Sequence, residues 1–268
     1  MPFTHNPTPP RGDPSQVCLF ATCLTDTFFP RAAVATVRLL RHLGCTVHFP
    51  PDQTCCGQGQ FNNGLHDDAR ILARNLIQAF PPDATVVSPS ASCVAMIREY
   101  YPSLFAHDPA WHTRARDFAR RTFEITEFLA HHLQPDWPSL APRLAARVTY
   151  HYSCHSRTLG IEPSLTESLL RAVADLDYHP AHKLDQCCGF GGTFAVKEPA
   201  ISDALVAEKV AHLAATHPDI IVVNDAGCTL NIAGYCHRNN LNFRFLHVAE
   251  LLAEALGLIA PDSESVSA

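Results

Sequence analysis

The chain has 268 residues, of which 47% are hydrophobic and 17% are charged, a composition typical of a globular protein with a sizeable core. Its formal net charge is −6, and its 20 lysines and arginines are spread along the sequence, which argues against nucleic acid as a partner. No apolar run reaches the ~20 residues of a membrane span, and the proline-rich start lacks the features of a signal peptide, so we expect a soluble, cytoplasmic protein.

In the first part of the chain, strand-like and helix-like segments alternate. The apolar run over residues 17–22 predicts a strand ending at Cys23, and helical spacing after Pro30 predicts a helix up to Gly44. Further elements are expected as strands over residues 45–49 and 84–88, as helices over residues 65–80 and 117–133, and as a helix starting near Cys93. Three prolines in residues 134–142 then indicate a boundary.

The second part repeats this order. We expect strands over residues 147–152, 176–178 and 220–223, and helices over residues 165–174, 199–216 and 247–258, with one more helix starting near Cys228. Such alternation predicts an α/β fold made of two pseudo-repeated halves, with largely parallel sheets and outer helices. The expected domains are residues 17–142 (the first half) and 143–260 (the second half), between a disordered tail over residues 1–16 and a polar tail over residues 261–268.

Eight of the eleven cysteines form a duplicated pattern. Each half carries one cysteine, then an adjacent pair followed by glycine, then one more cysteine, and the spacings in the two halves are nearly equal. Two such sets are hard to obtain by chance, and an odd number of cysteines without a signal peptide favours metal or redox chemistry over disulfides. The candidate cofactor-binding and metal-ligating residues are Cys23, Cys55, Cys56, Cys93, Cys154, Cys187, Cys188 and Cys228.

The predicted elements explain why these thiols can converge. Each cysteine lies where a strand ends or a helix begins, and in an open parallel sheet these ends line one crevice. Gly57 and Gly189 supply the unusual dihedrals that present both members of a pair to one site. Adjacent thiolates suit an iron–sulfur cluster, whereas zinc ligands usually stand two to four residues apart. The three remaining cysteines are expected to be small buried hydrophobes: Cys18, Cys45 and Cys236.

Four motifs carry a resemblance to a known family. They are CLTDTFFP at residues 23–30, QTCCGQ at 53–58, TYHYSCH at 149–155 and CCGFGG at 187–192. With them, the chain resembles the CCG-type cysteine-rich proteins over residues 17–258. The resemblance implies an iron–sulfur electron-transfer subunit, not itself catalytic, of a cytoplasmic complex that oxidises L-lactate to pyruvate. It also implies iron–sulfur clusters, which we expect to be of the 4Fe-4S type, and partner subunits that include a ferredoxin-like iron–sulfur protein.

Three alternatives remain open at this point. The same cysteines could bind zinc in a structural or interaction module, the chain could serve another 2-hydroxy acid oxidase, or the cysteine pairs could perform thiol–disulfide chemistry. The family pattern also ends each repeat with Cys-x-x-Cys, whereas Ser90 and Asp225 occupy the first of those positions here. Either an oxygen ligand replaces the fifth thiolate or the cluster takes four. His155 is a candidate ligand or proton shuttle beside Cys154, and His151 lies just before it.

Overall fold

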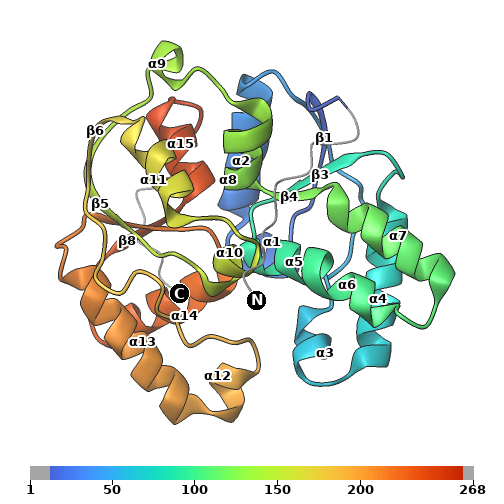
Figure 1. Cartoon of the computed structure of the whole chain (residues 1–268). Helices are drawn as coiled ribbons and strands as arrows, with labels where there is room; N and C mark the ends of the chain where they lie inside the picture. Colours follow the sequence, from blue (N-terminus) through green and yellow to red (C-terminus); the bar gives the residue numbers. More distant parts are fainter. Residues whose placement is uncertain (1–12, 262–268) are drawn as a thin grey trace.

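The computed structural model describes residues 13–261, so the expected tails lie outside the described residues apart from positions 13–16 and 261. The described chain contains two four-stranded sheets with the orders β2-β1-β3-β4 and β6-β5-β7-β8. All pairings within both sheets are parallel. Helices cover the sheets (Figure 1), which confirms the predicted pair of α/β halves.

The first half is built from β1 (Gln16–Leu19), α1 (Cys23–Phe28), α2 (Pro30–His42), β2 (Thr46–His48), α3 (Gln58–Asn62), α4 (His66–Ala79), β3 (Thr85–Ser88), α5 (Ala91–Ala95), the π-helical segment η1 (Met96–Tyr100), α6 (Tyr101–Leu104), α7 (Pro109–Arg120), β4 (Thr122–Glu124), α8 (Ile125–Phe128), the π-helical segment η2 (Leu129–Leu133) and α9 (Trp137–Leu140). The second half is built from β5 (Arg143–Tyr150), α10 (Cys154–Thr158), α11 (Pro163–Arg171), β6 (Ala174–Tyr178), α12 (Phe194–Lys197), α13 (Pro199–Ala214), β7 (Ile220–Val223), α14 (Ala226–Arg238), β8 (Arg244–His247) and α15 (Val248–Ala255).

The repeat extends to the hydrogen-bond register. Leu19 of β1 is paired with Val87 of β3, and Tyr150 of β5 is paired in the same way with Val222 of β7. One residue further on, Phe20 N–H donates to the carbonyl of Val87 and His151 N–H donates to that of Val222. Phe20 and His151 therefore occupy equivalent places, three residues before the first cysteine of each half.

Two stretches differ from the sequence-based expectation. The helix predicted over residues 117–133 is wrong, because α7 ends at Arg120 and Thr122–Glu124 forms strand β4, which pairs with β3. All three strand residues are buried, so pairing and burial at the sheet edge outweigh the helical spacing of the surrounding residues. The helix predicted from His247 likewise starts at Val248, and Arg244–His247 is the unpredicted strand β8.

One hydrophobic core extends across both halves. It contains Val17 and Phe128 from the first half together with Tyr150 and Leu252 from the second. Helices α2 and α15 pack against each other in the upper middle of Figure 1, where the first and last parts of the chain meet. Among residues 13–261, none of the helices combines the length and the apolar character that crossing a bilayer requires.

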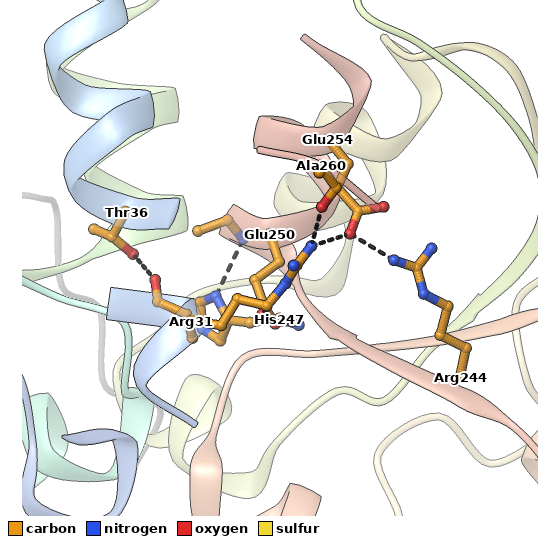
Figure 2. A network of polar contacts seen from close by, with 9 residues as sticks. Arg31, Thr36, Arg244, His247, Glu250, Glu254 and Ala260 are labelled. Atoms are coloured by element: carbon orange, nitrogen blue, oxygen red, sulfur yellow. Dashed lines mark hydrogen bonds and ion pairs between the residues drawn. The ribbon is translucent and has the colours of Figure 1, made fainter. Parts of the chain in front are cut away.

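A partly buried network of charges adds to this contact between the halves (Figure 2). Arg31 at the start of α2 forms ion pairs with both Glu250 and Glu254 of α15. Arg244 of β8 also contacts Glu254, at 2.6 Å, and the Glu254 side chain is only 1% exposed. His247 and Glu250 form a reciprocal cap at the start of α15. The orientation of the two halves is thus determined by paired charges as well as by apolar packing.

Candidate metal centre

Each predicted ligand lies in the segment that follows a strand, either in the loop or at the start of the next helix. Helix α1 begins at Cys23, shortly after the inner strand β1, and α10 begins at Cys154, shortly after the inner strand β5. Cys93 and Cys228 lie in the first turns of α5 and α14. The adjacent pairs precede α3 and α12, in the loops that follow the edge strands β2 and β6. The eight thiols consequently form two groups, one for each half.

The first group is compact. The sulfur atoms of Cys23 and Cys55 are 3.6 Å apart, and those of Cys56 and Cys93 are 3.3 Å apart. Gly57 has a φ of +80°, and its backbone N–H donates to the Cys55 sulfur at 3.4 Å. The buried hydroxyl of Tyr101 donates to the carbonyl of Cys56 at 2.8 Å, which anchors the pair from behind.

The second group repeats this geometry. Gly189 has a φ of +81°, and its N–H donates to the Cys187 sulfur at 3.4 Å. A side-chain hydrogen bond joins Cys154 and Cys187, and another joins Cys188 and Cys228. A nitrogen of His151 and the sulfur atoms of Cys188 and Cys228 all lie within 4.8 Å of one another. The predicted turn at each glycine is thus present in both halves.

Hydrogen bonding within each group favours one thiolate. The bond from Cys23 lowers the pKa of Cys55 to about 2, and the same bond raises the pKa of Cys23. In the second half, the bond from Cys154 lowers the pKa of Cys187 to about 2 and raises that of Cys154. The first member of each pair is therefore the preferred thiolate. Clustered thiolates that accept backbone N–H groups are a donor set suited to a soft metal centre such as an iron–sulfur cluster.

Each group also has a buried and an open side. Cys56, Cys93, Cys188 and Cys228 are buried, whereas Cys23 and Cys187 are exposed. A bound centre would consequently be shielded by the protein on one side and be accessible from the other. The predicted hydrophobic cysteines Cys18, Cys45 and Cys236 are buried among apolar side chains.

Ser90 and Asp225, which occupy the positions where the resemblance led us to expect a fifth cysteine, face each other across the halves. Asp225 Oδ2 accepts hydrogen bonds from Ser92 N–H at 2.8 Å and from the Ser90 hydroxyl at 3.5 Å. Its other oxygen accepts from Gly227 N–H at 3.1 Å, so one buried carboxylate caps both α14 and α5. The Ser90 hydroxyl accepts from Cys93 N–H. These oxygens stabilise the helix starts that carry Cys93 and Cys228.

His155 links the two groups. Its Nδ1 lies 3.7 Å from the Cys154 sulfur, and its Nε2 lies 3.0 Å from Gln58 Nε2, next to the first cysteine pair. Helix α10 packs against α5, and α1 packs against α14, so the cysteine-bearing helices of one half contact those of the other. Figure 1 shows α1, α5 and α10 together at the middle of the molecule. The two cysteine groups are therefore adjacent.

One residue near the second group was missed by the sequence analysis. Lys209 of α13 is fully buried, and its Nζ donates to the carbonyl of Leu184 at 2.9 Å. Burial lowers its pKa to about 8, against the opposing effect of Cys188 and Cys228 nearby. The available signal was a single lysine within the apolar stripe of the helix predicted over residues 199–216.

Comparisons with known proteins agree with this architecture. The CCG cysteine-rich domain model matches residues 17–98 and 148–233, one match in each half. The chain is 42% identical over 243 residues to lactate utilization protein A 2 of Bacillus cereus strain AH820, covering 90% of this chain and 99% of that protein. It is 43% identical over 236 residues to lactate utilization protein A of Shouchella clausii strain KSM-K16, covering 88% and 98% respectively.

Proposed function

This chain belongs to the family of proteins built from the CCG cysteine-rich domain, and on that basis we propose that it is an iron–sulfur electron-transfer subunit for lactate utilisation. The observation that carries the proposal is the convergence of two four-cysteine groups at the carboxyl ends of two equivalent sheets. The names of relatives that match nearly the whole chain support lactate as the metabolite concerned.

In this proposal each half, residues 17–142 and 143–260, holds one centre of the 4Fe-4S type. The ligands are Cys23, Cys55, Cys56 and Cys93 in the first half and Cys154, Cys187, Cys188 and Cys228 in the second. Bound clusters supply one-electron transfer. The chain contributes the thiolates, the N–H groups of Gly57 and Gly189 that stabilise them, and the buried side that keeps water away.

The proposed partners are other subunits of a cytoplasmic complex that oxidises L-lactate to pyruvate, among them a ferredoxin-like iron–sulfur protein. The exposed residues Cys23 and Cys187 mark the side from which such a partner exchanges electrons with the centres. Oxidation of lactate itself is assigned to the complex, and this chain serves as its electron relay.

Metal analysis of the full chain, purified without oxygen, tests the proposal. We expect a brown protein containing iron and acid-labile sulfide. Cys187→Ser should lower the iron and sulfide content by about half, and the matched variant Cys55→Ser should do the same through the first half. Stoichiometric zinc without sulfide would instead establish a zinc-binding module, and complete loss in either single variant would indicate one shared centre.

A further inference from the structure

His151 is a buried polar side chain without a hydrogen-bond partner. It is 1% exposed, and neither Nδ1 nor Nε2 forms a hydrogen bond with any described group. Leaving a polar group unpaired in the interior costs on the order of 1–3 kcal/mol, and most buried imidazoles are therefore bonded. The packing of this side chain alone does not account for that cost.

The imidazole is directed at the second cysteine group. One of its nitrogens lies within 4.8 Å of the sulfur atoms of both Cys188 and Cys228, a separation at which one metal centre can contact all three atoms. His151 also follows the inner strand β5 directly, so its backbone is held by the sheet through the hydrogen bond to the carbonyl of Val222. The ring is therefore presented from a rigid element.

The first half has a phenylalanine in the same place. Phe20 forms the equivalent backbone hydrogen bond to Val87 and is packed in the same core cluster as Cys56 and Cys93. A phenyl ring fills this position without leaving any polar atom unpaired. Packing at this position consequently does not require an imidazole. The two halves differ at the position that faces the cysteine group, which is Phe20 in the first half and His151 in the second.

A second difference lies on the neighbouring helix. Gly57 lies against Ala69 and Leu72 of α4, which a Cβ at this glycine would contact, and Gly189 lies in the same way against Ser202 and Leu205 of α13. Helices α4 and α13 are therefore equivalent, with Leu72 matching Leu205. Four residues beyond Leu72 and Leu205 stand Leu76 and Lys209, both fully buried. At these two matched positions the second half therefore has an imidazole and an ammonium group, and the first half has the hydrocarbon side chains of Phe20 and Leu76.

We propose that His151 is a nitrogen ligand of the second metal centre, which makes the two centres chemically different. The inference rests on the proposed function, because it assumes that the cysteine groups bind metal. His151 joins the four thiolates of the second centre as a ligand that adds no negative charge, and the positive charge of Lys209 nearby raises the reduction potential of this centre. The second centre is therefore the one reduced at higher potential, and the first retains an all-sulfur ligand set.

Pulsed electron paramagnetic resonance tests this assignment without measuring activity. The full chain is labelled with ¹⁵N-histidine, purified without oxygen and reduced with dithionite. We expect a strongly coupled histidine nitrogen in the native chain, its loss in His151→Phe, and its retention in His155→Phe, which removes the other imidazole near Cys154. His151→Cys serves as a second variant that keeps a ligand, and it should retain the metal while losing the nitrogen coupling.

The results separate this inference from the proposed function. Absence of nitrogen coupling from a native chain that contains iron and sulfide would overturn the role of His151, as would a coupling that survives His151→Phe or disappears in His155→Phe. A chain that contains zinc and no sulfide would refute the proposed function. In that case X-ray absorption at the zinc edge decides the inference, since imidazole scattering must be present in the native chain and lost in His151→Phe.

Discussion

Replacing Asp225 with alanine should destabilise the contact between the two halves. The substitution removes the cap on α14, worth about 1 kcal/mol, and a charge-assisted hydrogen bond from Ser92, worth about 1.5–3 kcal/mol. It also removes the weaker contact with Ser90. The expected loss is about 3 kcal/mol, which corresponds to a melting temperature lower by roughly 6–12 °C for a chain of this size.

Thermal unfolding followed by circular dichroism, on metal-containing protein purified without oxygen, measures this loss. Asp136→Ala is the matched control, because Asp136 also caps a helix but lies on the surface, where its carboxylate accepts hydrogen bonds from the backbone and side chain of Ser139. The control should lower stability by no more than about 1 kcal/mol. If Asp225→Ala had no larger effect than Asp136→Ala, the argument that one carboxylate holds two helix starts together would be refuted.

Two further predictions concern a glycine and a buried acid. Gly189→Ala should lose metal from the second half, because the added Cβ would lie 2.8 Å from the Ser202 carbonyl oxygen at a residue whose φ is +81°. The control Gly64→Ala has open space around the added Cβ and should lower the stability by only about 1 kcal/mol. Metal analysis and melting temperatures of the two variants check this prediction. Burial raises the pKa of Glu124 from 4.5 to about 8, so the folded protein binds a proton that the unfolded chain releases, and stability should fall as the pH rises from about 4.5 through 8. Glu124→Gln should flatten this slope in melting curves recorded at several pH values, and an unchanged slope would contradict the assignment.

Much of the fold was predictable from sequence because its signals are local. The strand over residues 220–223 is observed as Ile220–Val223, and the helix expected after Pro30 is observed as Pro30–His42. A continuous apolar run and a proline at the first helical position define these elements without reference to the rest of the chain. Strand β4 could not be predicted in this way, because Thr122–Glu124 is short and becomes a strand by pairing with β3.

The duplicated cysteine pattern by itself predicted two thiol groups, the four cysteines in each, and the glycine turns that present them. These features depend on the spacing of residues along the chain and on glycine's ability to adopt a positive φ, both of which can be read from the sequence. The roles of the residues around the thiols were decided only by the tertiary structure. Ser90 and Asp225 are far apart in the chain, and their meeting as a shared helix cap depends on how the halves pack. The direction of the His151 ring depends in the same way on strand register and burial, which arise only when the sheet is assembled.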